Sequence, residues 1–270
     1  MFQLTIRPIA EFSAADRRAV RGVFTDIDET VSTDSRLTGE AYAALERLKV
    51  AGLMVIPVTG RPAGWCDLIA RFWPVDAVIG ENGAFWMWLD RSAGRLRTRY
   101  VQDEATRAEG RRRLEAVKAD VLREVPGAGI ASDQPYRAAD LAIDFCEDVP
   151  ALPRAEVDRI VSIFERHGAQ AKISSIHVNG WFGDYDKLTT TRLMMAELYG
   201  VDLEAARSEW VFSGDSPNDS PMFGFFPNAV GVANVADFAD RMPHLPRWIT
   251  RARSGAGFAE MARALLDARR

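Results

Sequence analysis

The stretch Gly22–Thr30, which reads GVFTDIDET, joins a short apolar run to a pair of aspartates. Apolar runs of about four to eight residues that end in polar residues are typical of buried strands in a parallel sheet. Similar runs lie at residues 53–58, 76–80, 210–213 and 229–232, and segments with helical periodicity lie between them. Strands that alternate with helices in this way predict an α/β fold, in which helices cover both faces of a Rossmann-like parallel-sheet core.

The segments between these runs carry signals for helix ends. Thr38 is placed to cap a helix whose apolar side contains Ala41 and Leu45, and Gly52 is placed to end that helix. A full capping box is not expected, because the position three residues after Thr38 is Ala41, whose side chain cannot bond back to the cap. A shorter helix is expected over residues 63–72.

The middle of the chain follows a different pattern. Leu114, Val117 and Val121 recur at helical spacing, which predicts an amphipathic helix over residues 104–125. Further along, the pattern predicts a strand at 141–145, a second amphipathic helix stopped by Gly168, and a strand at 171–179.

These two patterns predict two domains. Residues 1–88 and 185–270 would form the core domain, because both blocks carry the pattern of apolar strands and helices. Residues 89–184 would form an α/β cap domain inserted into the core.

Composition excludes several classes of protein. The 270 residues are 47% hydrophobic and 27% charged, with a net charge of -4, as in ordinary soluble proteins. Because there is no basic excess, we expect no nucleic-acid partner, and the basic run at 111–113 is interpreted as a solvated helix face.

Apolar runs are too short for a membrane span, and residues 1–7 carry no signal-peptide pattern. Cys66 and Cys146 form no C-x-x-C pair, so we expect neither a disulfide framework nor a thiolate zinc site, and a cytoplasmic location is the simplest expectation.

Reactive side chains follow the predicted core strands at the points where the strands end. Asp26 and Asp28 follow the first strand, Thr59 follows the second, and Asp215 and Asp219 follow the strand at 210–213. Ligands of open α/β sheets bind beyond the carboxyl ends of the strands, so these side chains are expected at one site. One basic residue, Lys187, stands where the chain returns from the cap.

Such a cluster of carboxylates favours phosphoryl-transfer chemistry with a metal. Clustered carboxylates repel one another and raise one pKa, and a hard divalent cation such as Mg²⁺ relieves this repulsion. The Lys187 ammonium and the Thr59 hydroxyl would then hold the remaining phosphate oxygens. A carboxylate can attack phosphorus directly, and a second carboxyl can protonate the leaving oxygen and then activate water.

The combined motifs resemble the haloacid dehalogenase superfamily of phosphohydrolases. More narrowly, the chain is similar to subfamily IIB, whose members include Cof-type hydrolases, sucrose phosphatases and phosphomannomutases, and whose α/β cap (type C2B) follows the third core strand. The matching segments are Phe24–Thr30, Val58–Pro62, Glu81–Ala84, Asp186–Lys187 and Gly214–Asp219. Each segment alone is weak evidence for the resemblance. Together they are specific, because they occur in the family's order and lie at predicted strand ends.

The resemblance implies roles for the acidic residues and a Mg²⁺ cofactor. Asp26 would be the nucleophile and a metal ligand. Asp28 would be the general acid and base, with its backbone carbonyl on the metal. Asp215 would be a metal ligand, and Asp219 would support the metal site.

The resemblance also implies the groups that surround the phosphoryl group. Thr59 and Lys187 would bind it directly. Gly60, Arg61 and Asn218 would lie around the phosphoryl group. Asn218 would either contact the phosphate or orient Lys187.

One position departs from the family pattern. Many members have glycine after the second aspartate, where this chain has Glu29. We expect an ordinary backbone conformation at Glu29, because a positive φ is costly for residues other than glycine.

In the cap, alternation along 171–179 places His177 and Asn179 on one face and Val178 on the other. We expect Val178 to pack under the cap helices, and His177 and Asn179 to contact the leaving group of the substrate. Asn82 is a further candidate for binding substrate.

Other interpretations of these residues stay open. The aspartates could cap helices or turns, Thr59 could be a hydroxyl at a strand end, and Lys187 and His177 could be solvated or merely hydrogen-bonded. Glu81 could simply end a strand, and residues 85–88 favour packing over ligand binding.

Three functions are consistent with the sequence. The leading hypothesis is a Mg²⁺-dependent phosphatase of a small phosphorylated metabolite, with a sugar phosphate preferred. The second is a phosphomutase of the phosphomannomutase type, and the third is a protein that binds a phosphorylated ligand without turnover. A nucleotide-dependent oxidoreductase is disfavoured, because no Gly-x-Gly-x-x-Gly motif follows the first strand.

Overall fold

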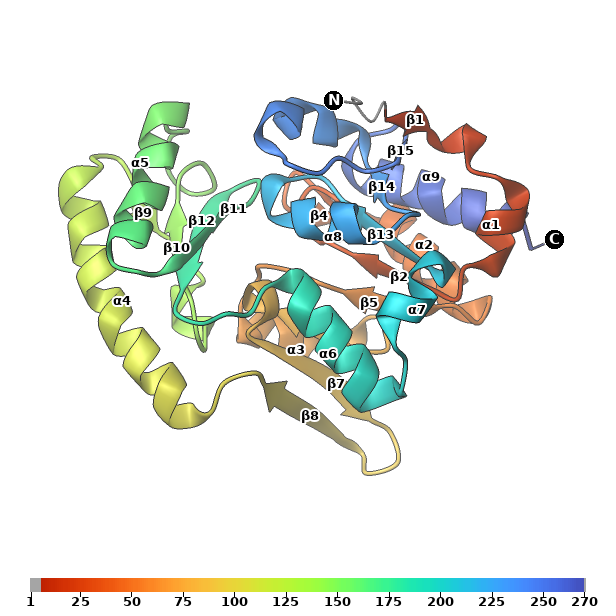
Figure 1. The fold of residues 1–270 in the computed structure, drawn as a ribbon, viewed down its shortest axis with the longest axis horizontal. Coiled ribbons are helices and arrows are strands. Elements are labelled where there is room, and N and C mark those ends of the chain that lie inside the picture. Colours follow the sequence, from red (N-terminus) through yellow and green to blue (C-terminus); the bar gives the residue numbers. More distant parts are fainter. Residues whose placement is uncertain (1–5, 270) are drawn as a thin grey trace.

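Strand β2 (Gly22–Thr25) is buried along its whole length in a six-stranded parallel sheet, as its apolar sequence predicts. The computed structural model describes residues 6–269 and places helices on both faces of this sheet (Figure 1). The predicted Rossmann-like α/β core is therefore confirmed. Across the sheet the order is β1 (Arg7–Pro8), β15 (Trp248–Ile249), β14 (Val230–Gly231), β13 (Trp210–Gly214), β2 and β5 (Met54–Pro57).

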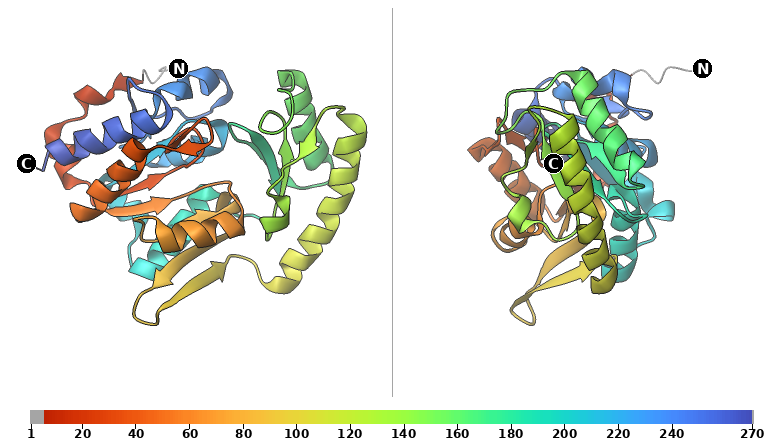
Figure 2. Two further views of the ribbon diagram at one scale, coloured as in Figure 1. Left: turned by 180° about the vertical axis from the view of Figure 1, so that it is seen from behind. Right: turned by 90° about the vertical axis from the view of Figure 1, so that its left-hand side faces the viewer.

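Successive side chains of β2 point to opposite faces of the sheet, and each face has its own apolar core. Val23 packs in the core whose helices are α2 (Gly39–Val50), α3 (Ala63–Phe72) and α9 (Ser254–Asp267), which Figure 2 shows from behind. Phe24 packs in the core whose helices are α6 (Lys187–Tyr199), α7 (Leu203–Ala206) and α8 (Ser220–Phe225). Burial on both faces explains why these strands are continuously apolar.

A hairpin extends the core beyond β5. Strand β6 (Val78–Gly80) joins the main sheet through a parallel bridge between Val58 and Ile79, and it pairs with β7 (Phe85–Asp90), which pairs with β8 (Arg95–Tyr100). The predicted boundary between residues 88 and 89 falls inside β7, and the division of the chain into domains stays a prediction.

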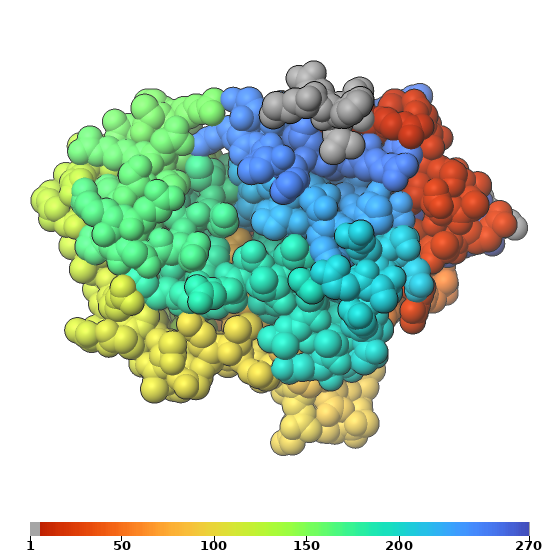
Figure 3. Space-filling view, viewed as in Figure 1, coloured from red at the N-terminus to blue at the C-terminus, as the bar shows by residue number. Residues whose placement is uncertain are grey.

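The inserted segment has its own antiparallel sheet, packed under two helices. On the face drawn in Figure 3, its atoms (yellow to green) lie against those of the core, and we call this boundary the seam. Its strands follow the order β11 (Gln170–Ile173), β12 (His177–Trp181), β10 (Leu141–Asp144) and β9 (Gly129–Ile130). The helices are α4 (Glu104–Glu124) and α5 (Arg154–Arg166), which confirms both predicted amphipathic helices.

The prediction of one strand over 171–179 is wrong. The chain instead forms the hairpin β11–β12, with a turn at residues 174–176. The Ser174 hydroxyl accepts hydrogen bonds from the backbone N–H groups of Ile176 and His177, and these bonds hold the turn. Serine indicates a turn less strongly than glycine, proline or asparagine, so the alternating pattern over 171–179 predicted one continuous strand.

Short elements complete residues 6–269. The remaining helix and strands are α1 (Ala14–Ala19), β3 (Ser32–Thr33) and β4 (Arg36–Leu37). The 3-10 turns are η1 (Ile9–Glu11), η2 (Glu81–Gly83), η3 (Gln134–Tyr136), η4 (Arg207–Glu209), η5 (Pro217–Asp219) and η6 (Ala233–Arg241). Within this described part of the chain, no helix has the length and apolarity needed to cross a bilayer. The signal-peptide expectation rests mainly on residues 1–5, which lie outside the described residues.

Candidate active site

The parallel pairing of β2 and β13 brings two of the predicted aspartates together. Thr25 is in register with Ser213, so Asp26 and Asp215 leave the carboxyl ends of neighbouring strands. The Asp26 N–H continues the ladder by donating to the Ser213 carbonyl at 2.8 Å. The register of two buried apolar strands therefore places the site, and a slip of one residue would turn these side chains to the opposite faces of the sheet.

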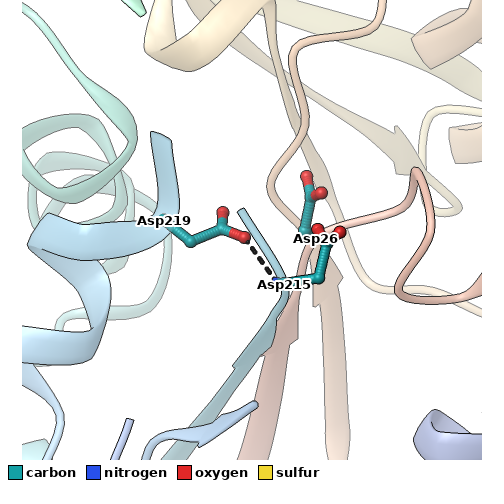
Figure 4. Close-up of side chains that lie close together, drawn as sticks. All are labelled: Asp26, Asp215 and Asp219. Carbon is teal, nitrogen blue, oxygen red and sulfur yellow. Dashed lines mark hydrogen bonds between the residues drawn. The ribbon is translucent and has the colours of Figure 1, made fainter. Parts of the chain in front are cut away.

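Asp219 completes a buried cluster with these two residues, which we call the carboxylate cluster (Figure 4). One carboxylate oxygen from each of Asp26, Asp215 and Asp219 lies within 4.8 Å of the others. The Asp219 Oδ2 atom accepts hydrogen bonds from the backbone N–H groups of Asp215 at 2.9 Å and Ser216 at 3.3 Å, which fixes the loop after β13. The cluster thus combines a carboxylate that shapes the loop with two that end the strands.

Lys187 supplies the positive charge that contacts this cluster. Its Nζ atom lies 2.7 Å from Asp26 Oδ1 and 2.7 Å from Asp219 Oδ1, and the side chain is buried. Lys187 is the first residue of α6, whose start is fixed by a capping box between Asp186 and Thr189. Helix capping therefore sets the position from which this lysine reaches the cluster.

The cluster holds more negative charge than Lys187 neutralises. Burial raises the pKa of Asp26 to about 7 against the opposing effect of Lys187. Burial and the neighbouring carboxylates also raise the pKa of Asp215 well above its ordinary value. Within residues 6–269, the Asp215 carboxylate accepts hydrogen bonds from two neutral donors, Thr30 Oγ1 at 3.4 Å and Asn234 Nδ2 at 2.9 Å. Three carboxylates beside a single ammonium leave an excess of negative charge that a divalent cation would neutralise, so the oxygen donors present fit Mg²⁺.

Asp28 lies outside the carboxylate cluster and is held by Arg61. The Arg61 Nε atom donates to Asp28 Oδ1 at 2.8 Å. The same guanidinium donates to two carboxylates of the inserted segment, Glu147 at 2.9 Å and Asp133 at 3.3 Å. Arg61 therefore links the predicted general acid to the segment that covers the site.

The remaining predicted phosphate-binding positions lie in a tightly packed loop after β5. Thr59 is buried, and its Oγ1 atom accepts a hydrogen bond from the Arg61 N–H at 3.0 Å. A Cβ atom on Gly60 would lie 3.2 Å from Asn82 Nδ2 and 3.4 Å from Asn179 Oδ1, so glycine permits this close approach.

Asn82 joins this loop to the loop after β13. The Asn218 Nδ2 atom donates to Asn82 Oδ1 at 3.2 Å. The structure thus brings together predicted site residues that follow three different strands, and their individual roles stay predictions.

Comparison with known proteins identifies this fold. No protein-family model and no curated protein matches the sequence. Solved structures do match, among them a protein from Thermoplasma acidophilum, with 18% identity and a TM-score of 0.68 over 92% of this chain and 98% of that one. A putative HAD/COF-like hydrolase from Plasmodium vivax matches with 15% identity and a TM-score of 0.65 over 94% and 99%. The sucrose-phosphatase from Synechocystis sp., in complex with sucrose and phosphate, matches with 14% identity and a TM-score of 0.63 over 91% and 98%.

The chain has the fold of the haloacid dehalogenase-like hydrolases. The fold that the motifs implied is confirmed over both the core and the inserted segment, because the matches cover at least 91% of the chain.

The expectation of an ordinary backbone at Glu29 is wrong. Glu29 has a φ of 51°, in the left-handed region that favours glycine. Three hydrogen bonds hold Glu29 in this conformation. Its carboxylate accepts one from Ser254 Oγ at 2.9 Å, and its backbone carbonyl accepts one from Asn234 Nδ2 at 2.9 Å. Its backbone N–H donates one to Ser32 Oγ at 3.1 Å. Contacts from Ser32, Asn234 and Ser254 therefore hold a backbone conformation that glycine adopts more easily.

The cap residues predicted to contact the leaving group are buried at the seam with the core. Val178 packs in the apolar core of the cap, as expected, so its neighbours face the other way. Asn179 Nδ2 donates to Asp140 Oδ2 at 3.0 Å, and His177 Nε2 lies 2.9 Å from Glu147 Oε2. Both side chains therefore lie near the site while holding partners within the cap.

Sequence reasoning missed the importance of Glu81, which it interpreted chiefly as the end of a strand. The buried Glu81 carboxylate accepts four backbone N–H groups, one from Ala63 of the core and three from Ala138, Ala139 and Asp140 of the cap. Burial raises its pKa to about 7, while these hydrogen bonds act in the opposite direction. No local pattern signals such a role, because its partners lie up to 59 residues away in the chain.

Proposed function

We propose that this protein is a Mg²⁺-dependent phosphoric monoester hydrolase that acts on a small phosphorylated metabolite, in particular a sugar phosphate. The observation that carries the proposal is the buried carboxylate cluster beyond β2 and β13, in which the Lys187 ammonium contacts two of the three carboxylates. The haloacid dehalogenase-like fold supports it, and one of the similar solved structures is a sucrose-phosphatase. We also propose a cytoplasmic location, with which two free cysteines agree.

The metal would be held by oxygen atoms of the acidic residues. Asp26 and Asp215, with the backbone carbonyl of Asp28, would hold Mg²⁺, which when bound neutralises charge on the phosphoryl oxygens. Lys187 contacts Asp26 directly and would hold a phosphoryl oxygen beside it. Asp219 orients Lys187 through its second contact.

The chain's own residues would then carry two displacement steps. In the first, an Asp26 carboxylate oxygen forms a bond to phosphorus as the bond to the leaving oxygen breaks, and the Asp28 carboxyl gives its proton to that oxygen. In the second, the Asp28 carboxylate removes a proton from water, the water oxygen forms a bond to phosphorus, and Asp26 is released as a carboxylate. The products are the free alcohol and inorganic phosphate.

The cap would select the leaving group and exclude bulk water. Asn82, His177 and Asn179 are buried polar side chains at the seam, and hydroxyl groups of a sugar would exchange hydrogen bonds with them. A cover formed by a folded sheet favours a small metabolite over a phosphoprotein.

A screen of phosphorylated metabolites tests the proposal. We expect release of inorganic phosphate from a sugar phosphate with Mg²⁺, loss of release with EDTA, and loss with Asp26→Asn. Asp237→Asn, at an exposed ion pair with Arg253, serves as the matched control. Metal-independent turnover, or turnover that survives Asp26→Asn, would contradict the mechanism. Transfer of the group back to a sugar, with a bisphosphate required, would identify the phosphomutase instead, and ligand binding without turnover would identify the binding protein.

A further inference from the structure

A cleft of about 580 Å³ lies between the cap and the core, beside the loop that carries Asp219. On the cap side it is lined by β11 and by Arg154 at the start of α5. On the core side it is lined by Pro217 and Ser220, which flank Asn218 and Asp219, and by Arg241, Pro243 and His244. The view in Figure 1 shows β11 facing the start of α8 across this seam.

The cleft is basic. Its lining contains Arg154, Lys172 and Arg241 and no acidic residue. Arg154 pairs with Asp240 at 2.8 Å and Arg241 pairs with Asp158 at 2.5 Å, so carboxylates outside the lining already neutralise both arginines. Arg154 also has its Nε atom 3.9 Å from Asp158 Oδ2. A guanidinium has five N–H donors, so each arginine retains N–H groups that these contacts do not use.

Lys172 adds the charge that is not neutralised. It is in register with Asn179 on the neighbouring strand, so both side chains lie on the face of the cap sheet that is turned toward the core. Its sequence neighbours Ala171 and Ile173 also line the cleft and pack against the apolar core of the cap, so they supply its apolar wall. Among residues 6–269, Lys172 has no ion-pair or hydrogen-bond partner for its ammonium group. An ammonium group held in a cleft without a partner favours an anionic ligand.

We propose that this cleft binds an anionic group, a phosphate or carboxylate, with Lys172 as its main ligand and the free N–H groups of Arg154 and Arg241 as additional donors. Such a group would contact the cap and the core together. It could belong to the substrate, as a second anionic group remote from the phosphate that is cleaved, or to a separate small anion. The first source rests on the proposed function, and the second does not.

Binding of inorganic sulfate to the metal-free protein tests the site directly. With EDTA present, the carboxylate cluster repels anions, so calorimetry reports on the cleft. We expect sulfate to bind to the wild type and to bind Lys172→Gln at least about tenfold more weakly, as for loss of a hydrogen bond to a charged group. Lys118→Gln, at an ion pair on α4, is the matched control and should leave the affinity unchanged. Absence of sulfate binding, or equal affinity in Lys172→Gln, would overturn the proposal.

Kinetics with Mg²⁺ then separate the two sources. If the group belongs to the substrate, Lys172→Gln raises KM for glucose 1,6-bisphosphate about tenfold and leaves KM for glucose 6-phosphate unchanged. If the anion is separate, sulfate changes turnover of p-nitrophenyl phosphate in the wild type and not in Lys172→Gln. A protein that binds sulfate through Lys172 and hydrolyses none of these esters would contradict the proposed function while supporting the site.

Discussion

The two charged regions at the seam satisfy their carboxylates in different ways. In the region around Arg61 and Arg137, the carboxylates of Asp28, Asp133 and Asp140 each contact a guanidinium. In the carboxylate cluster, Asp215 contacts no basic side chain of the described part of the chain, and its carboxylate accepts hydrogen bonds from the neutral side chains of Thr30 and Asn234. Both regions are buried and acidic, so burial and acidity by themselves do not mark a catalytic site.

This difference shows which region is prepared for a cation. Carboxylates that already hold a guanidinium gain little from a metal, and their contacts join cap to core. The carboxylates around Asp215 repel one another until a positive ligand arrives. The comparison therefore predicts that charge changes in the cluster alter catalysis most, and that charge changes around Arg61 alter stability of the seam.

The largest effect is expected from Asp215→Asn. Mg²⁺-dependent kcat/KM should fall on the order of 10³-fold, because the metal loses an anionic ligand. In the absence of metal the variant should be more stable than the wild type, because one buried repulsion is removed. Thermal melts with and without Mg²⁺ check both effects, since the wild-type Tm should rise with the metal and the variant Tm should not. An unchanged response to Mg²⁺ would show that the ion binds elsewhere.

Lys187→Met should cost about 3 to 5 kcal/mol of unfolding free energy. The change leaves two buried carboxylates, Asp26 and Asp219, without their cation. Urea denaturation at neutral pH measures the loss, and the double variant with Asp219→Asn should recover part of it. A loss below about 1 kcal/mol would mean that the cluster is hydrated in solution.

Arg61→Met should cost less, about 2 to 3 kcal/mol, because its carboxylate partners Asp28 and Glu147 keep some exposure and can be rehydrated. Urea denaturation again measures the change. The contacts that close the seam should weaken at the same time, which limited proteolysis of the cap would detect. Arg71→Met, at an exposed ion pair on α3, provides the control and should stay near the wild type.

The smallest effect is expected from Glu147→Gln, and it depends on pH. The neighbouring His177 ring, followed by Arg61, lowers the pKa of Glu147 from its ordinary value of 4.5 to about 2. Because the folded-state pKa is depressed, the stabilisation is present above about pH 4.5 and is lost as pH falls toward 2. Wild type and Glu147→Gln should differ by about 1 to 2 kcal/mol at pH 6, and the difference should shrink across that window. A difference that grows as the pH falls would contradict the assigned contacts.

The sequence predicted the parts of this molecule that local patterns specify. Apolar strands, their polar ends and the cap helices follow from periodicity, so the meeting of Asp26 with Asp215 and Lys187 was foreseeable. The contacts of Arg61 with Glu147 and Asp133 were not, because they join segments more than 70 residues apart that carry no shared pattern.

The two wrong predictions have the same physical origin. At Glu29 the local rule against positive φ was outweighed by hydrogen bonds from Asn234 and Ser254. At residues 174–176 a serine hydroxyl made a turn that composition alone signals weakly. In both places side chains, and not backbone preferences, decided the conformation.

The four hydrogen bonds on Glu81 restrict how the two parts of the molecule can separate. They converge on a single side chain, so a movement that preserves them must be a rotation about that point. A sliding displacement would break several buried bonds to a carboxylate at once, at a cost of about 1.5 to 3 kcal/mol for each. A rotation of the cap about Glu81 breaks fewer of these bonds than a sliding displacement does, so we expect the seam to open most at the edge farthest from Glu81.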